Sequence, residues 1–362
     1  MKDWLKIFLV FCLTSAVFYG YYYFTKETRL DIVYKNWDGP SYVLAAMSMY
    51  RPAAAYQNNF IHSGDIHPDW TWLPAHFPLY PLLIRAFSFL GYFPAMLVIS
   101  LVFTLGVYLA FFELVKALGI TRHPLALTLP MVFLTPRWFI ISHTGGSESI
   151  YLFFFILFLL FFSRREHGRA AVMAALAQLA RPQGALIAVG VGIVALFELM
   201  QKRDLFRTIR TYWVYLLVPA TLLGIFTFYY FQTGNFFAFF SATRLTSNLQ
   251  NLPFRTFSYP LPNIETFWQE VNVYDYVLFF ASCLIMFRKR LWRYGVISLT
   301  YFIPLVFLQH SDISRYAVPL IPILFIAFSE LIEKKEFGLA ILLMSPAFYL
   351  YAFNFMDFNH GS

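Results

Sequence analysis

The feature that most constrains this chain is the division of its sequence into long apolar runs separated by short charged segments. Hydrophobic residues make up 59% of the 362 residues and charged residues make up 13%, whereas a soluble domain carries about 25% charged residues. So few charges cannot cover the surface of an ordinary soluble domain. The pattern therefore predicts an all-α, polytopic integral membrane protein that forms a single membrane domain over residues 1–362.

The apolar runs are long enough, or nearly long enough, to cross roughly 30 Å of hydrocarbon. They cover residues 5–24, 94–115, 125–142, 149–162, 170–200, 212–231, 273–287, 294–308, 316–332 and 338–353. The run at 170–200 is too long for one crossing and is interrupted at Arg181-Pro182, so it predicts a helical hairpin. The expected total is about eleven transmembrane helices.

The orientation follows from the positions of Lys and Arg, because cytoplasmic loops of membrane proteins hold an excess of both. With the N-terminus in the cytoplasm, about 17 of the 27 Lys and Arg residues fall in short loops on that side. The loops at about 26–75 and 232–272 then lie outside and are expected to bear short surface helices. The net charge of +8 follows from this bias, and no nucleic-acid partner is predicted.

The first apolar run resembles a signal peptide in having Lys2 and Lys6 before it, but it lacks a convincing small-residue cleavage site. We expect it to stay as a permanent anchor. Cys12 and Cys283 both lie in apolar runs, so no disulfide framework is indicated.

One group of residues in the first long loop superficially resembles a metal site. Its spacings of about three, two and two residues fit neither a helical face nor a familiar zinc pattern, so a solvated loop is the favoured interpretation. No cofactor is predicted, although a divalent metal ion is kept as an alternative. The group consists of His62, Asp65, His67 and Asp69.

Membrane insertion does not explain Asp38, His76, Glu148, Arg181 and Arg315. Arg181 comes about 12 residues, or about 18 Å of helix, after the preceding basic loop, which places it at membrane depth. An arginine there normally faces a partner or a water-filled cavity, and a broken helix there is covered by protein. The alternative is an arginine that snorkels to the interface.

Each of the other charged positions also has a purely structural interpretation. Asp38 precedes Gly39-Pro40 and could cap a helix or serve a turn; otherwise it is a carboxylate placed to act as a general base. Glu148 could serve a helix N-terminus, or it could face the same side as Asp38. Arg315 could anchor the chain at the outer boundary, or its planar fork could grip a phosphate.

The motifs and their order resemble the GT-C type of membrane glycosyltransferase, most specifically the GPI mannosyltransferase 2 family and its bacterial relatives. The resemblance spans roughly residues 30–325, and each motif alone is short. The matching segments are Trp37-Asp38, Phe77-Pro78-Leu79-Tyr80-Pro81, Ser147-Glu148, Ala180-Arg181-Pro182-Gln183-Gly184, and Arg315-Tyr316 with Pro319.

This resemblance implies a GT-C-like fold and an enzyme that takes a sugar from a polyprenyl-phosphate donor in the non-cytoplasmic leaflet and inverts the anomeric centre. Mannose is the expected sugar. The compact external loops favour a bacterial inner-membrane enzyme whose acceptor is a lipid or glycan other than GPI, with membrane lipids around it. Asp38 corresponds to the catalytic carboxylate of such families. The residues expected to bind donor or acceptor are Trp37, His76, Tyr80, Glu148, Arg181, Gln183 and Arg315.

The chemistry of such a transfer agrees with these residue types. The leaving group is an anionic phosphate, so cations such as Arg181 and Arg315 would stabilise it. The attacking hydroxyl must lose a proton, and Asp38 is the candidate base. Two other classes stay open: a flippase or transporter of lipid-linked sugar, and a noncatalytic assembly subunit. The lack of an inverted repeat and the gathering of these residues toward one face favour the enzyme.

Overall fold

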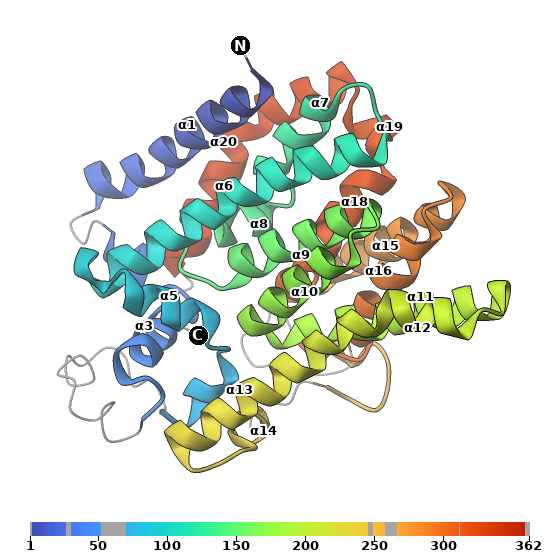
Figure 1. The fold of residues 1–362 in the computed structure, drawn as a ribbon. Coiled ribbons are helices and arrows are strands. Elements are labelled where there is room, and N and C mark those ends of the chain that lie inside the picture. Colours follow the sequence, from blue (N-terminus) through green and yellow to red (C-terminus); the bar gives the residue numbers. More distant parts are fainter. Residues whose placement is uncertain are drawn as a thin grey trace.

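The computed structural model describes residues 2–26, 30–51, 70–244, 249–257, 266–310 and 312–358. Within these ranges every regular element is a helix, and an isolated bridge joins Leu249 to Leu308 (Figure 1). The predicted all-α class is therefore confirmed. The metal-like group at His62, Asp65, His67 and Asp69 lies outside the described residues.

Six helical stretches in the described part of the chain are long and apolar enough to cross a membrane. Each has 20 or more residues, and a helix of about 20 residues spans the roughly 30 Å of the hydrocarbon core. These helices identify the chain as a membrane protein. The stretches are Asp3–Thr25 (α1), Tyr92–Leu118 (α6), Pro182–Lys202 (η5 and α11), Leu205–Thr233 (α12, η6 and α13), Gln269–Arg288 (in α15, Thr266–Arg288) and Lys335–Asp357 (in α20, Lys335–Phe358).

The other predicted crossings form shorter or interrupted helices. Three runs give α9 (Glu148–Ser163), α10 (His167–Ala180) and α16 (Trp292–Val306). Residues 125–142 are divided into α7 (Pro124–Thr128), η4 (Leu129–Val132) and α8 (Pro136–Ile141), because prolines lack the N–H that a continuous helix needs. Residues 316–332 are likewise divided, into the end of α17 (Ile313–Tyr316), η8 (Val318–Leu320), α18 (Ile321–Ala327) and α19 (Ser329–Ile332). The count of about eleven crossings stays a prediction.

The helix break predicted at Arg181-Pro182 is present. Helix α10 ends at Ala180, Arg181 is extended, and η5 (Pro182–Gly184) leads into α11 (Ala185–Lys202). A Cβ at Gly184 would lie only 2.3 Å from Cα of Gln178. The chain can therefore turn back this tightly because Gly184 has no side chain.

Short helices do occur in the two long loops, as predicted. The first loop forms α2 (Asp31–Tyr34), α3 (Gly39–Ser48) and η2 (Trp70–Ala75), and the second forms α14 (Ala238–Arg244) and η7 (Arg255–Phe257). However, α3 is not a surface helix: most of its residues are buried, and it packs against α6 and α5 (Leu79–Ala86). A short η3 (Ser88–Leu90) then leads into α6.

Helix α9 lies at the centre of the fold, with α6 on one side and α10 on the other (Figure 1). Its aromatic and aliphatic side chains are mostly buried, among them Tyr151, Phe155 and Phe158. Figure 1 also shows α3 at the end of the molecule opposite α7 and α19. The N-terminal end of α9 meets α3 through Ser147 and Tyr42, which hydrogen-bond to each other.

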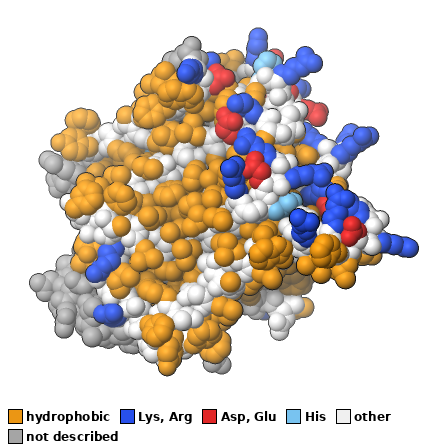
Figure 2. All heavy atoms as spheres, in the orientation of Figure 1, with side chains coloured by type: hydrophobic (Ala, Val, Ile, Leu, Met, Phe, Trp, Pro, Cys, Tyr) orange, Lys and Arg blue, Asp and Glu red, His pale blue; other side chains and the backbone are white. Residues whose placement is uncertain are grey.

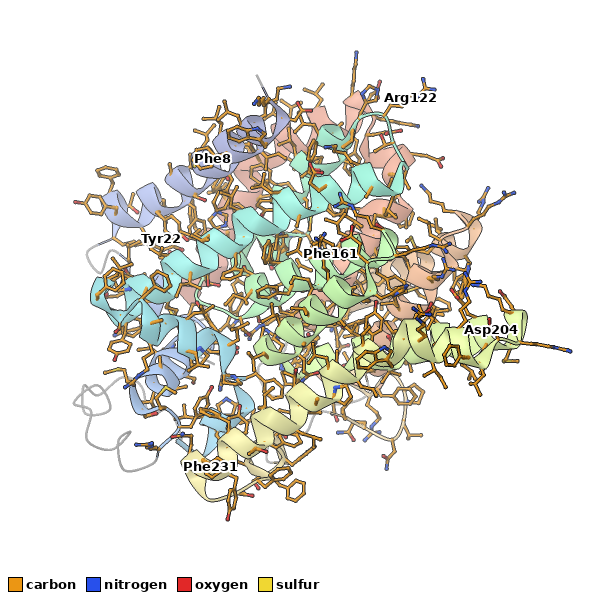
Figure 3. All side chains as sticks on the ribbon, viewed as in Figure 1. Phe8, Tyr22, Arg122, Phe161, Asp204 and Phe231 are labelled. Carbon is orange, nitrogen blue, oxygen red and sulfur yellow. The ribbon has the colours of Figure 1, made fainter. Side chains whose placement is uncertain are left out.

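The basic residues gather at one end of the molecule. Figure 2 shows most of the visible Lys and Arg side chains at the end where α7, α11 and α12 lie in Figure 1, and a broad apolar surface beyond them. Figure 3 places Arg122 and Asp204 toward this end and Phe231 away from it. The charge asymmetry predicted for the loops is therefore present in three dimensions.

Candidate functional site

Four of the charged residues predicted from the sequence meet in one network, which we call the ion-pair cluster: Asp38, Glu148, Arg181 and Arg315. Nη2 of Arg315 lies 2.5 Å from Oδ2 of Asp38, and its Nε lies 2.7 Å from Oε1 of Glu148. The same Glu148 oxygen lies 2.6 Å from Nη1 of Arg181. Residues that are far apart in the sequence are thus joined by charge-assisted hydrogen bonds.

Different elements supply these side chains. Asp38 precedes α3, Glu148 begins α9, Arg181 occupies the break after α10, and Arg315 lies in α17. Asp38 occupies the N-cap position of α3 and Ser147 that of α9, yet neither side chain makes a capping hydrogen bond. Helix capping therefore does not explain either residue.

The two acids of the cluster differ in their exposure to solvent. The Glu148 side chain is 2% exposed, whereas that of Asp38 is 33% exposed. Arg181 and Arg315 are 14% and 15% exposed and paired with carboxylates, so neither is a freely exposed anchor. The two positive and two negative charges balance, which allows the cluster to exist away from water because unpaired buried charges are costly.

Tyr42 and Ser147 form an uncharged layer beside the cluster. Arg181 donates to Oγ of Ser147 at 3.3 Å, and this oxygen lies 2.6 Å from the hydroxyl of Tyr42. The ring of Tyr42 packs edge-on against His76 at 4.7 Å and against Tyr80 at 4.9 Å between centroids. These contacts fix the side of the cluster that faces α3 and α5.

His76 and Tyr80 take different places. Nε2 of His76 lies 3.7 Å from Oδ1 of Asp38, so His76 is a neighbour of Asp38, the residue predicted to act as the base. Tyr80 is fully buried, and its hydroxyl donates to the carbonyl of Met96 at 2.7 Å. Tyr80 therefore fastens α5 to α6, and its hydroxyl bonds to Met96 and Ser100 of α6 rather than to the charged residues.

Trp37 and Gln183 border the cluster without joining its ion pairs. The guanidinium of Arg315 lies 5.1 Å from the centre of the Trp37 ring, within the range of a cation–π contact. Trp37 has a left-handed backbone (φ 46°), which turns the chain from α2 into α3. Gln183 donates from Nε2 to the carbonyl of Tyr316 at 3.3 Å and so joins the helix break to α17.

A second charged pair next to this site was not among the predicted residues. Nε of Arg137, in α8, lies 2.9 Å from Oδ1 of Asp312, and the Arg137 guanidinium lies 4.1 Å from the Phe355 ring centre. Asp312 also caps α17 by accepting from the backbone N–H of Arg315 at 3.3 Å. Arg137 is a lone arginine in an apolar run, the same signal that identified Arg181, whereas Tyr42 gave no such signal.

The Asp38 carboxylate is held in its charged form. Burial opposes ionisation, but the positive charge of Arg315 and the nearby His76 outweigh it, so the pKa of Asp38 lies well below its ordinary value of 3.8. Asp38 is consequently ionised at neutral pH.

The loop before α9 leaves space for Glu148. A Cβ at Gly146 would lie 2.3 Å from Oε2 of Glu148, so a side chain there would displace the carboxylate. Oε2 is buried and has no hydrogen-bond partner among the described residues. Glu148 therefore has one oxygen committed to both arginines and a second that is enclosed by protein without a hydrogen-bond partner among the described residues.

In the described part of the chain, no group of three or more His, Cys, Asp and Glu residues is arranged to hold a metal ion. The carboxylates of the cluster are instead engaged by guanidinium groups. No protein-family model matches the chain, and no curated protein matches it by sequence.

Proposed function

We propose that this protein is an inverting membrane glycosyltransferase that moves a sugar from a polyprenyl-phosphate donor to an acceptor hydroxyl at the extracytoplasmic face. The ion-pair cluster is the observation that carries the proposal, because it joins two guanidinium groups to a partly exposed carboxylate. The proposal includes a GT-C-like fold with about eleven crossings. Mannose is the proposed sugar, and a lipid or glycan is the proposed acceptor.

The two arginines suit the leaving group. When the bond between the anomeric carbon and the phosphate oxygen breaks, the bonding electrons stay on the phosphate, and its negative charge increases. Arg181 and Arg315 can stabilise that charge, and preorganised donors of this kind stabilise a transition state strongly. Since both are paired with carboxylates before the donor binds, the phosphate must replace part of that pairing.

Asp38 suits the role of base. The acceptor oxygen forms a bond to the anomeric carbon from the face opposite the leaving phosphate, and its proton passes to a carboxylate oxygen of Asp38. The products are the glycosylated acceptor and polyprenyl phosphate, and Asp38 then returns the proton to water. The greater exposure of Asp38, 33% against 2% for Glu148, favours Asp38 for this step.

Glu148 suits the positioning of the two arginines. A single oxygen, Oε1, accepts from both Arg181 and Arg315, so the carboxylate fixes the distance between the two guanidinium groups. His76 lies beside Asp38 and suits the orientation of the acceptor.

The arrangement in space supports an extracytoplasmic site. Helix α3, which carries Tyr42 and follows Asp38, lies at the end opposite α7 and α19 in Figure 1. The basic side chains gather at that other end in Figure 2, and basic loops mark the cytoplasmic side. The bacterial inner membrane, with the N-terminus in the cytoplasm, is the proposed location.

The test is turnover by the purified protein in lipid vesicles. Polyprenyl-phosphate mannose with a labelled sugar is supplied together with a panel of lipid and glycan acceptors, and both products are separated. Release of polyprenyl phosphate with an equal amount of glycosylated acceptor supports the proposal. Movement of intact sugar-lipid across the bilayer would indicate a flippase. Neither outcome, after the assay is repeated with other polyprenyl-phosphate sugars, would favour a noncatalytic subunit.

A further inference from the structure

Helix α12 (Leu205–Tyr212) has two unlike faces at the basic end of the molecule. Leu205, Phe206 and Ile209 are 58%, 77% and 55% exposed, and they share one side of the helix by their spacing. Arg207 and Arg210 are exposed on the other side. A basic amphipathic helix with large exposed apolar residues is typical of a membrane interface.

The length of the helical stretch sets the depth of α12. Leu205–Thr233 contains 29 residues, or about 43 Å of helix, whereas the hydrocarbon core is about 30 Å thick and the whole bilayer with its headgroups is about 40–45 Å. The α13 segment (Leu217–Thr233) is long enough to cross most of the hydrocarbon. The two turns of α12 therefore reach the depth of the headgroups, with Trp213, 60% exposed, near the boundary where tryptophans are enriched.

The charges near α12 leave its arginines free for an outside anion. The carboxylate of Asp204 accepts from the backbone N–H of Arg207 at 2.9 Å and so serves as the helix cap. Glu198, on the neighbouring α11, is occupied by Lys202 at 2.8 Å and Arg293 at 2.6 Å. Within the described part of the chain, the guanidinium groups of Arg207 and Arg210 form no ion pair or hydrogen bond.

We propose that α12 is a binding surface for anionic phospholipids, with Arg207 and Arg210 contacting the headgroup phosphates and Leu205, Phe206 and Ile209 entering the adjacent acyl region. The combination of free cations with an exposed apolar face argues for a lipid and against a soluble anion, which would not need the apolar face. This surface is independent of the proposed glycosyl transfer.

The experiment measures the affinity of the purified full-length protein in neutral detergent for phosphatidylglycerol, with phosphatidylcholine as the uncharged comparison, by native mass spectrometry. The test variant is Arg207→Gln with Arg210→Gln. Its matched control is Arg122→Gln with Arg164→Gln, which removes the same charge from exposed positions elsewhere. Each basic residue near an anionic surface contributes about fivefold in affinity, so the test variant should bind on the order of 25-fold more weakly.

The control variant and phosphatidylcholine binding should both stay close to the wild-type values. A Phe206→Ser, Ile209→Ser variant should also lose phosphatidylglycerol while keeping its net charge, and Arg207→Lys with Arg210→Lys should restore binding, because a headgroup phosphate requires only a cation. Equal losses in the test and control pairs, or equal binding of the two lipids by the wild type, would overturn the proposal. A size-exclusion profile like that of the wild type confirms that each variant is folded.

Discussion

The Asp38→Asn substitution separates a catalytic role of Asp38 from a structural one. Asparagine keeps the shape and hydrogen-bonding capacity of the side chain but cannot accept the proton of the attacking hydroxyl. If Asp38 is the base, turnover from polyprenyl-phosphate sugar should fall on the order of 100-fold or more. A 100-fold loss corresponds to about 2.7 kcal/mol of transition-state stabilisation.

The structure predicts a much smaller effect on folding. Arg315 loses one anionic partner but keeps its contact with Glu148 at 2.7 Å, which it shares with Arg181. Asp38 is 33% exposed, and pairs with such access to water contribute about 1 kcal/mol or less to stability. The expected pattern is a large loss of turnover with only a small change in the melting temperature.

The assay compares initial transfer rates and melting curves of the wild type, Asp38→Asn and Asp31→Asn in the same vesicles. Asp31 is the matched control because it is an exposed acid in the same loop, so its substitution should change neither quantity. Near-normal transfer by Asp38→Asn would refute the reasoning and make Glu148 the leading candidate for the base. Equal losses of stability and transfer would show that Asp38 has a structural role.

Four further outcomes are expected. Arg181→Leu should reduce kcat/KM for the donor by about 100-fold, as loss of one transition-state donor does, in a steady-state transfer assay. Glu148→Gln should lower the unfolding free energy by about 3–5 kcal/mol, because it removes the anion shared by two nearly buried guanidinium groups, and denaturant unfolding measures this. Burial lowers the pKa of His310 below its ordinary 6.5, although Asp312 acts in the opposite direction. The unfolded chain therefore binds a proton more readily than the folded chain, so the free energy of unfolding should fall as the pH drops below about 6.5. His310→Gln should flatten that pH profile. Arg165→Cys and Lys289→Cys should react with a membrane-impermeant thiol reagent only after the cells are opened.

Each of these outcomes has a contrary result. Unchanged donor kinetics in Arg181→Leu would remove Arg181 from phosphate binding, and wild-type stability of Glu148→Gln would show that the arginines find other partners. A pH profile that His310→Gln does not alter would assign the acid sensitivity to another group. Labelling of position 165 or 289 in intact cells would reverse the predicted orientation.

The sequence predicted the helical membrane class because composition and run length depend little on tertiary context. It failed to show how two apolar runs are divided. Residues 125–142 and 316–332 have the hydropathy of transmembrane helices, but Pro130 and Pro136 interrupt the first, and the second is broken into short turns around Pro319 and Pro322. Hydropathy is averaged over a window of residues, so it does not show where a proline lacks the backbone N–H that a continuous helix needs.

The members of the ion-pair cluster could be predicted because each is a charged residue at a position where membrane insertion does not require one. Their pairing could not, since neither the sequence nor the spacing says that Arg315 reaches both Asp38 and Glu148. Arg137 carries the same signal as Arg181, but the apolar run that contains it resembles an ordinary crossing. Tyr42 lies against the cluster through helix packing alone, which only a structure reveals.

The ion-pair cluster also has a consequence for the order in which the chain is inserted during synthesis. Glu148 begins α9 and Arg181 follows α10, and the two side chains contact each other at 2.6 Å, so they can enter the bilayer as a neutral pair. Arg315 is made about 130 residues later, on the order of ten seconds at ordinary translation rates. Asp38 is synthesised before the other three members of the cluster and has no contact with Arg315 until that residue is made. The cluster is therefore complete only when the last third of the chain, which carries Arg315, has packed against the first third, which carries Asp38.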